Sequence, residues 1–319
     1  RKIVAMKLKQ RFIDTITLME NMADGTAIGA LKITNIGDPP LWDKSIQYQQ
    51  AKSFAQLLWQ GDLQDISEQY KAINLILSGG SRAGGARPKL LAVDENNVHW
   101  LVKFNRKQDR FNVAALEWAC LQAFKLAGVP CAYAEIDTFS GDGSNALNCL
   151  KVKRFDISPN GGRYALLTIN ALLKNEHTQE DPLYGRYEDI AEIIRSHSYQ
   201  PQQDLEQLFA QLLINQALLN TDDHLRNFSI LQDEKGWRLS PVYDVVPDES
   251  FAREHAIAFN GSAYLPELSQ AFETGKAFKL PKPVIQNVIN RVKSALKNWP
   301  KLLKTAGITD KRLLGLTEK

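Results

Sequence analysis

Three oxygen-bearing side chains in one short region have the types and spacing for metal-assisted phosphoryl transfer. Asp222 and Asn227 stand five residues apart in "NTDDHLRN", directly after a strongly helical stretch, and Asp244 follows in "PVYDVVPD". Phosphoryl transfer needs an aspartate that orients the attacking hydroxyl and separate oxygen ligands for magnesium. Between them, His224 would orient the loop or contact phosphate, and Arg226 would neutralise transferred charge. A solvated turn that caps the helix explains "TDDHLRN" equally well on its own.

A hairpin predicted between these residues would return Asp244 to the neighbourhood of Asn227. The segments "FSILQ" and "WRLSPVY" read as two strands around the turn "DEKG", so Gln232 should oppose Trp237. Extending that register places Asn227 opposite Val242 and Asp244 just past the open end of the hairpin. The three side chains would then converge on one ion.

A lysine and a glutamate on neighbouring predicted elements form a second candidate group. Glu117 falls on the apolar stripe of the helix predicted in "FNVAALEWACLQAFKLAGV", where a lone carboxylate would be costly. Lys103 ends the predicted strand "VHWLVKF", and its neighbours Val102 and Phe104 would face the other side of the sheet. Such a pair aims an ammonium group at nucleotide phosphates in kinase-like folds. A charge that extends to water at an edge explains either residue alone.

A glycine-rich loop, "SGGSRAGGARPK" at residues 78–89, lies between two predicted strands. Without Cβ atoms, its backbone N–H groups can approach phosphates closely. It matches neither the Walker A motif nor GxGxxG, and on its own it reads as a flexible hairpin loop.

The order of predicted elements indicates an α+β fold with two lobes. The segments "INLIL", "KLLAVD", "VHWLVKF", "AEIDTF" and "ALNCLKVKRF" read as strands of a mostly antiparallel sheet interrupted by one helix. Helical patterns follow, most clearly in "DLEQLFAQLLINQALL" and "PKPVIQNVINRVKSALKNW". We therefore expect a sheet-rich N-terminal lobe at residues 1–155, with a leading subdomain, and a helical C-terminal lobe at residues 156–319.

Composition is that of a globular protein expected in the cytoplasm. The chain is 44% hydrophobic and 24% charged, and its three cysteines show neither disulfide-framework nor zinc-ligand spacing. No apolar run or leader pattern implies a membrane span or export. Residues 276–319 contain eleven lysines and arginines but only two acidic residues, Asp310 and Glu318. A solvated helical face explains such a run, and an acidic partner such as nucleic acid is the alternative.

Taken together, these segments resemble the HipA family of bacterial toxin serine/threonine kinases over roughly residues 72–300. The strongest motifs are "TDDHLRNFS" and the following "PVYD", supported by "SRAGGARPK", "WLVKF", "ALEWACLQAFKLAGV" and "VKRFD". The resemblance implies a protein-kinase-like (HipA-like) fold that uses ATP and Mg²⁺ to phosphorylate a protein.

By position, the resemblance also implies roles for individual residues. It makes Asp222 the catalytic base and makes Asn227 and Asp244 the magnesium ligands. Lys103 would hold the ATP phosphates, supported by Glu117, while the glycine loop would cover them and Ser81 or, second, Ser78 would be autophosphorylated. The nucleotide-contacting residues implied are Ser81, Ala83, Gly84, Gly85, Lys89, Lys103, Glu117, the hinge residues Lys153, Arg154 and Phe155, and His224 and Tyr243.

Family likeness further implies a toxin whose target is a protein, in the family an aminoacyl-tRNA synthetase among others. A helix-turn-helix antitoxin, and through it DNA, would be its partner, with no role for a membrane. Three rival functions stay open on the residues alone. They are a small-molecule phosphotransferase, a catalytically idle regulator that binds a partner or DNA through the basic tail, and a metal-dependent phosphohydrolase built on "DDH" and Asp244.

Overall fold

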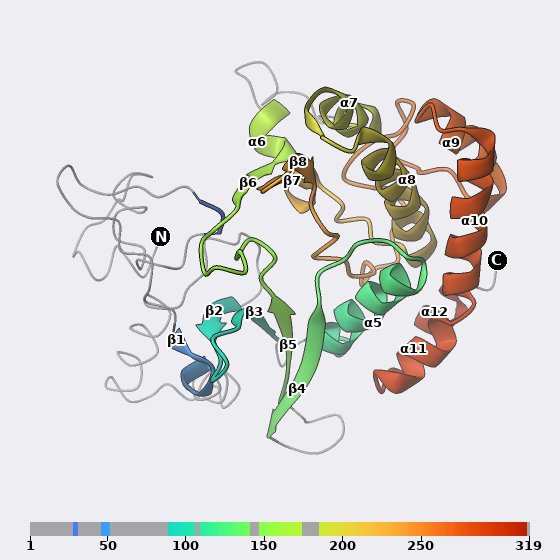
Figure 1. The fold of residues 1–319 in the computed structure, drawn as a ribbon. Coiled ribbons are helices and arrows are strands. Elements are labelled where there is room, and N and C mark those ends of the chain that lie inside the picture. The colour runs from blue at the N-terminus through green and yellow to red at the C-terminus, as the bar shows by residue number, and fades with distance from the viewer. Residues whose placement is uncertain are drawn as a thin grey trace, which may run out of the picture. The chain divides into compact units, whose positions relative to one another are not determined.

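The computed structural model describes residues 28–30, 46–51, 89–105, 109–140, 147–173 and 185–317. By their contacts these residues form two compact units (Figure 1). The first contains the described residues up to Asp109 together with 134–163, and the second contains 110–133 and those from Tyr164 onward. The helix at residues 113–126 thus belongs to the second unit, whereas the expected lobe boundary at residues 155 and 156 would place it in the first.

A five-stranded sheet forms the first unit. Its strand order is β1-β2-β3-β5-β4, antiparallel except for the β1–β2 pair. The strand bounds are Ile46–Gln47 (β1), Lys89–Val93 (β2), His99–Phe104 (β3), Ala134–Ser140 (β4) and Leu147–Lys153 (β5). Strands β2 to β5 confirm the pattern predicted from sequence. The predicted strand "INLIL" lies outside the described residues.

One face of this sheet is built from alternate residues of β3. Trp100, Val102 and Phe104 are buried and belong to one hydrophobic cluster with Leu90 and Cys149 of the neighbouring strands. Because side chains alternate across a strand, Lys103 must point to the opposite face, as the sequence predicted. Apolar burial on one side therefore fixes where the lysine points.

A buried ion pair closes the first unit after β5. Arg154 donates from Nε and Nη2 to the two carboxylate oxygens of Asp156, at 2.9 and 2.6 Å, and both side chains are almost fully buried. The Gly29 N–H donates to the same carboxylate at 2.7 Å. Burial alone would raise the pKa of Asp156, but these hydrogen bonds and the Arg154 charge hold it below its ordinary value.

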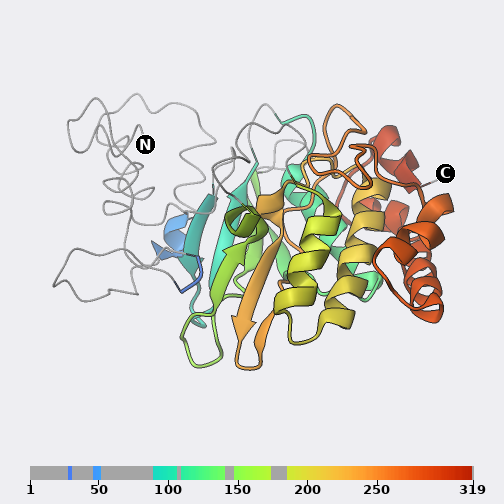
Figure 2. The same ribbon diagram turned by 90° about the horizontal axis from the view of Figure 1, so that it is seen from above.

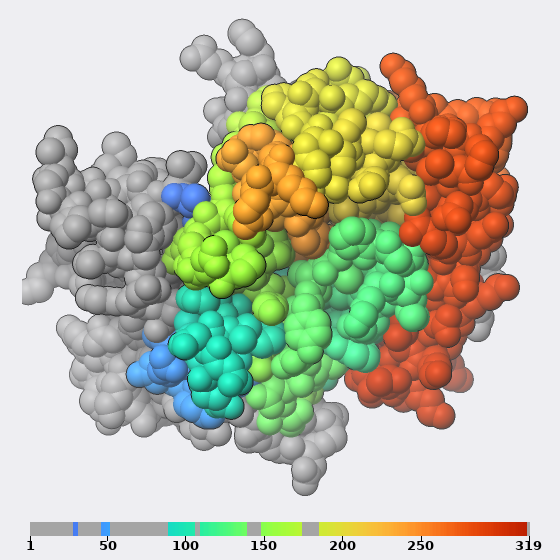
Figure 3. Space-filling view, viewed as in Figure 1, coloured from blue at the N-terminus to red at the C-terminus, as the bar shows by residue number. Residues whose placement is uncertain are grey.

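Helices dominate the second unit. Their bounds are Val113–Leu126 (α5), Ile169–Leu173 (α6), Tyr187–His197 (α7), Pro201–Leu218 (α8), Ala271–Ala277 (α9), Lys282–Leu296 (α10), Trp299–Thr305 (α11) and Lys311–Leu314 (α12). The Asn112 side chain caps α5 by accepting from the Ala115 N–H, and Gly128, with φ of +67°, turns the chain after it. Helices α10 and α11 pack on α5, so the red C-terminal surface borders the green surface in Figure 3.

A three-stranded antiparallel sheet stands beside α7 and α8, the yellow helices of Figure 2. Its strands are Ala165–Thr168 (β6), Ser229–Asp233 (β7) and Gly236–Leu239 (β8), in that order. Gln232 pairs with Trp237, which confirms the predicted hairpin. Strand β6 was not predicted, because its short segment lies far in sequence from its partner β7.

The described residues contain no helix with the length and apolar character needed to cross a membrane. Cys120, Cys131 and Cys149 are all free thiols, in line with the absence of a disulfide pattern.

The Arg154–Asp156 pair yields a stability prediction. Asp156→Asn removes the carboxylate that pairs with the buried Arg154 guanidinium, so we expect the free energy of unfolding at neutral pH to fall by about 3–5 kcal/mol. The wild-type pair stabilises fully above the unfolded-state pKa of Asp156, and that contribution disappears as pH falls through its lower folded-state pKa. The variant should therefore lose less stability on acidification. Urea unfolding at several pH values measures both effects.

Glu273→Gln provides the matched control, because it removes an exposed carboxylate that pairs with Lys276 at 2.7 Å. Exposed pairs contribute at most about 1 kcal/mol. Hydrogen exchange should show lost protection in residues 147–157 for Asp156→Asn alone. Equal, small effects of the two substitutions would contradict the structural role of the buried pair.

Candidate active site

The loop from α8 to β7 carries the predicted base. Helix α8 ends at Leu219, whose φ of +53° turns the backbone sharply and whose carbonyl accepts from the Asp248 N–H at 2.8 Å. The Asn220 side chain donates to Asn215 Oδ1 at 3.1 Å and accepts from the Val246 N–H at 3.2 Å. Two hydrogen bonds thus fasten the start of this loop to the segment just after Asp244.

Asp222 projects from this loop into solvent, with 84% of its side chain exposed. Desolvation by nearby protein, together with the charges of Asp244, Asp223 and Asp248, raises its pKa above the ordinary value, and the His224 imidazole opposes the rise. The negative charge of Asp244 therefore acts on Asp222 and favours its protonated form.

The Asn227 carboxamide has a fixed orientation. Its Nδ2 donates to the main-chain carbonyl oxygen of Asp222 at 2.8 Å, and a carbonyl can only accept, so the amide cannot be turned the other way. The Asn227 N–H donates to the His224 carbonyl at 2.8 Å and closes the short 3-10 turn Leu225–Asn227. Oδ1 therefore points away from the Asp222 backbone and is suited to a hard cation such as Mg²⁺.

Asp244 adopts a backbone conformation that most residues avoid. Its φ of +57° lies in the left-handed region, which Asp tolerates better than most side chains and which concentrates at functional sites. The preceding Val242 donates to the Pro130 carbonyl and accepts from the Ala132 N–H, at 2.9 and 2.8 Å. The extended register that placed Asn227 opposite Val242 is therefore wrong.

The reason for this correction is that the main chain of Val242 has other partners. The β7–β8 ladder ends where the Ser240 N–H donates to the Ser229 carbonyl at 2.8 Å. In a continued ladder Val242 would be the next residue to bond to β7, but its N–H and carbonyl bond to the residues after α5 instead. Asp244 thus reaches the loop through a different partner from the one predicted.

A metal site built from these residues would use few protein ligands. Among the described residues, no three His, Cys, Asp or Glu side chains lie close enough to hold an ion. Magnesium at phosphoryl-transfer sites commonly takes only one or two protein side chains and completes its shell with substrate phosphates and water. One fixed amide oxygen and one carboxylate fit that pattern.

Asp223 is the residue that sequence reasoning missed. Its side chain is buried and accepts hydrogen bonds from the Tyr187 hydroxyl at 2.8 Å and from the Ala256 N–H at 3.1 Å, and it contacts His255 Nδ1 at 3.0 Å. The Asn215 amide also donates to the Tyr187 hydroxyl, at 3.1 Å. Asp222 and Asp223 point to opposite sides of the extended loop, so one is exposed and the other anchors it. Period-two alternation alone could have suggested this division.

The other predicted loop residues lie around the base. His224 Nε2 lies 3.9 Å from Asp222 Oδ1, while its Nδ1 is buried with no hydrogen-bond partner among the described residues. The Tyr243 hydroxyl donates to the Arg226 carbonyl at 2.9 Å and shares a 2.7 Å hydrogen bond with Ser229. Tyr243 therefore ties the loop to β7, a contact that the predicted nucleotide-lining role did not include.

In the first unit, two predicted phosphate-binding lysines stand side by side. Lys103 on β3 pairs directly with Lys89 on β2, so both side chains share the face opposite the hydrophobic cluster, and Lys103 is only 7% exposed. Glu117, 3% exposed on α5, belongs to the other unit, so its pairing with Lys103 stays a prediction.

The predicted hinge follows β5. Arg154 uses its side chain for Asp156 and its N–H for the His99 carbonyl at 2.9 Å, so an adenine would have to contact other backbone groups of residues 153–155. Lys153 is exposed at the end of β5, and Phe155 is half-buried. Ser78, Ser81, Ala83, Gly84 and Gly85 lie outside the described residues, so the glycine-loop predictions stay untested.

Residues 81–299 match the family model described as the HipA-like C-terminal domain. The chain belongs to this HipA-like family. The match begins in the glycine-rich segment and includes the strand lysine, the α8–β7 loop and Asp244, which together carried the resemblance seen in the sequence.

Solved structures support the HipA-like fold. HipA of Shewanella oneidensis, solved with HipB and its operator DNA, superposes with a TM-score of 0.66 at 15% identity over 99% of this chain and 78% of that chain. The kinase CtkA of Helicobacter pylori gives a TM-score of 0.53 at 12% identity over 72% and 88%. The chain therefore has a protein-kinase-like fold, with a sheet-rich N-terminal part and a helical C-terminal part.

A curated relative matches over a short segment. Y4mE of Sinorhizobium fredii, named as a proposed kinase, is 35% identical over 60 residues. That segment spans 19% of this chain and 14% of Y4mE.

The Asp223 anchor yields a prediction for this HipA-like loop. Tyr187→Phe removes the hydroxyl that serves both Asp223 and Asn215, and leaving buried polar groups without that partner should lower the free energy of unfolding by about 1–3 kcal/mol. Hydrogen exchange should accelerate in residues 219–228. Tyr264→Phe is the control. The Tyr264 hydroxyl also donates to a carboxylate, that of Glu254, but Tyr264 is 59% exposed, so water can replace the lost hydrogen bond. Equal loss of stability in both variants would contradict the anchoring role.

Proposed function

We propose that this HipA-like chain is an ATP- and Mg²⁺-dependent serine/threonine protein kinase that acts as the toxin of a toxin–antitoxin pair. The observation that carries the proposal is that Asp222, Asn227 and Asp244 have the different properties that a base and two metal ligands need. Asp222 is exposed and can meet a substrate hydroxyl, Asn227 offers an oriented amide oxygen, and the Asp244 charge acts on Asp222. These are the three polar roles that kinase chemistry assigns to a catalytic loop and the following metal ligand.

In this proposal each residue of the second unit has a defined task. Asp222 accepts the proton of a serine or threonine hydroxyl while it orients that oxygen for attack. Asn227 Oδ1 and the Asp244 carboxylate would hold magnesium. When bound, MgATP supplies the phosphoryl group and the metal charge that neutralises it. His224 borders the base, and Tyr243 keeps the Arg226 backbone against β7.

The first unit would supply the phosphate-binding cations. Lys103 and Lys89 lie on one face of the sheet, and both ammonium groups would contact the polyphosphate of ATP. Glu117 would orient Lys103, and Lys153, Arg154 and Phe155 would border the adenine. Ser81, or Ser78 in its place, would be the site of autophosphorylation.

Partners enter the proposal through the relatives. Because the Shewanella HipA structure contains HipB and operator DNA, we propose a helix-turn-helix antitoxin for this chain and, through it, contact with DNA. The substrate would be a protein, and family likeness makes an aminoacyl-tRNA synthetase the first class to examine.

Asp222→Asn tests the catalytic assignment. The amide cannot accept the hydroxyl proton, so phosphoryl transfer to protein should fall on the order of 10²–10⁴-fold while thermal unfolding is unchanged. The measurement is incorporation of labelled γ-phosphate from ATP with Mg²⁺ into cell-extract protein. Glu192→Gln, which neutralises an exposed acid on α7 paired with Arg195, should retain full activity. Undiminished transfer by the Asp222 variant would refute the assignment.

Substrate class and toxicity are tested in the same variants. Brief expression of the wild type should arrest growth and add phosphosites to host proteins, as seen by mass spectrometry, and Asp222→Asn should do neither. Label transferred from ATP to metabolites but not to protein would instead identify a small-molecule phosphotransferase. Binding of DNA with no affinity for MgATP would identify a catalytically idle regulator.

A further inference from the structure

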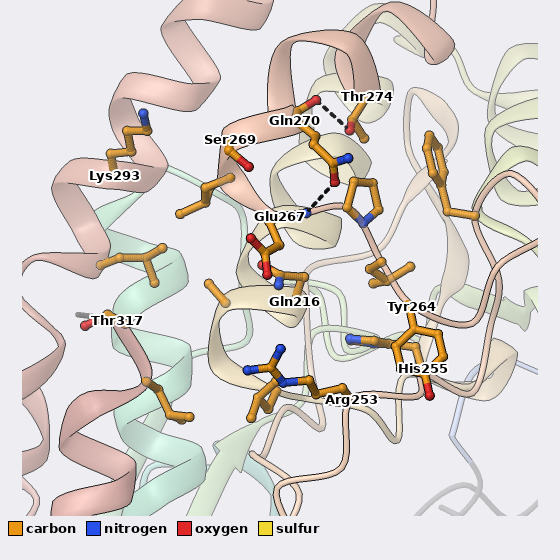
Figure 4. A pocket seen from close by; sticks show the side chains of 18 of the residues that line it. Gln216, Arg253, His255, Tyr264, Glu267, Ser269, Gln270, Thr274, Lys293 and Thr317 are labelled. Atoms are coloured by element: carbon orange, nitrogen blue, oxygen red, sulfur yellow. Dashed lines mark hydrogen bonds between the residues drawn. The ribbon is translucent and has the colours of Figure 1, made fainter. Parts of the chain in front are cut away.

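A large pocket lies in the second unit, on the far side of His255 from the predicted base. Its volume is about 1470 Å³, and its walls come from the end of α8, the segment 251–270, α9, α10 and the C-terminal turns after α12 (Figure 4). Pockets for small molecules usually measure about 300–1,000 Å³. This one has room for a stretch of polypeptide.

The pocket is lined by an excess of positive charge. Its cations come from several elements: Arg253, Lys293, Lys297, Lys311 and Arg312, against the acids Glu267 and Glu273. Glu273 is already paired with Lys276. Within the described parts of the chain, no carboxylate pairs with Arg253 or with the three lysines. Lysines 293 and 297 are one turn apart on the same wall, so both can reach one ligand.

Apolar and aromatic side chains line the same pocket. Phe251, Phe259, Leu265 and Leu296 contribute to its walls, and Tyr264 stands 59% exposed at its edge. Arg312 covers the Phe251 ring at 4.3 Å from the centroid. Aromatic and arginine side chains are enriched where proteins recognise polypeptide segments. The lining thus favours a ligand with both carboxylates and apolar side chains.

A hydrogen-bonding contact connects the pocket wall to Asp223, the residue next to the predicted base. His255 lines the pocket, and its Nδ1 lies 3.0 Å from Asp223 Oδ2, one residue along the chain from Asp222. The neighbouring Ala256 N–H donates to both Asp223 and the Thr221 carbonyl. A segment bound in the pocket would therefore rest against the wall that holds the catalytic loop.

We propose that this pocket docks an acidic segment with apolar side chains that belongs to the protein substrate. Its carboxylates would contact Lys293, Lys297 and Lys311, and its apolar side chains would pack against the Phe251 and Leu265 side of the pocket. That the docked partner is a substrate rests on the proposed kinase function, whereas the binding itself does not. A nucleic acid shares the negative charge but has no apolar side chains for these walls.

The test is a binding measurement on the full chain. The probe is a short fluorescein-labelled peptide that repeats Glu-Glu-Leu, followed by fluorescence anisotropy at low salt. The double variant Lys293→Glu, Lys297→Glu should weaken binding about tenfold or more, because rim charges are reversed and repel the probe. Lys301→Glu, Lys304→Glu is the matched control, with the same charge change on exposed α11 residues outside the pocket, and should bind within about twofold of wild type.

Two further probes separate charge recognition from other binding. The same peptide with glutamine for glutamate should bind far more weakly, and a single-stranded oligodeoxynucleotide should not compete with the labelled peptide. Equal binding of the glutamine peptide, no binding of the acidic peptide, or preferential binding of the oligonucleotide would each overturn the proposal.

Failure of the proposed function gives a different pattern. Asp222→Asn should bind the acidic peptide as wild type does, because Asp222 does not line the pocket. If the wild type binds the peptide through these lysines yet transfers no phosphoryl group to protein, the kinase function and the substrate assignment fail while the docking site stands. If the wild type phosphorylates protein with the pocket variants unaffected in both assays, the docking site fails alone.

Discussion

The candidate active site depends on one buried carboxylate. Asp223 accepts from the Tyr187 hydroxyl and the Ala256 N–H and lies against His255, so it joins helix α7, the α8–β7 loop and the segment after Asp244. A carboxylate can be kept in a protein interior only where such donors surround it. This requirement is structural, yet it decides where the next residue points. With Asp223 held inside, Asp222 has to face outward.

The rest of the site follows from similar backbone constraints. Leu219 and Asp244 both take left-handed conformations, and the hydrogen bonds from Asp248 to Leu219 and from Val246 to Asn220 hold the two segments together. Such conformations persist only where their surroundings determine them. In the first unit, apolar packing orients a side chain in a similar way. Alternate residues of β3 belong to a buried cluster on one face of the sheet, so Lys103 lies on the other face. Hydrogen bonds therefore orient the candidate site residues of the second unit, and apolar packing orients Lys103 in the first.

Local patterns in the sequence were sufficient to predict many of the described helices and strands. Strands β2 to β5, helices α5, α8 and α10, and the Gln232–Trp237 register follow from periodicity and turn residues, and the family resemblance was shown by the family match. Long-range partners could not be read in this way. Nothing near Asp223 indicates Tyr187 or His255, and nothing near Val242 indicates Pro130, since these contacts arise only once the helices have packed.

The hydrogen bond from Asn227 to the Asp222 backbone limits which residues this position can accept. An aspartate there would add charge for a cation, but it would set a carboxylate oxygen against a carbonyl oxygen, two acceptors with no proton between them. The hydrogen bond that shapes the loop favours an amide at this position, whereas a stronger charge for the proposed magnesium site would require a carboxylate. A single substitution at Asn227 that strengthened cation binding would therefore disturb the conformation of the loop. Stronger cation binding would first require changes at Asp244 or in the backbone of the loop.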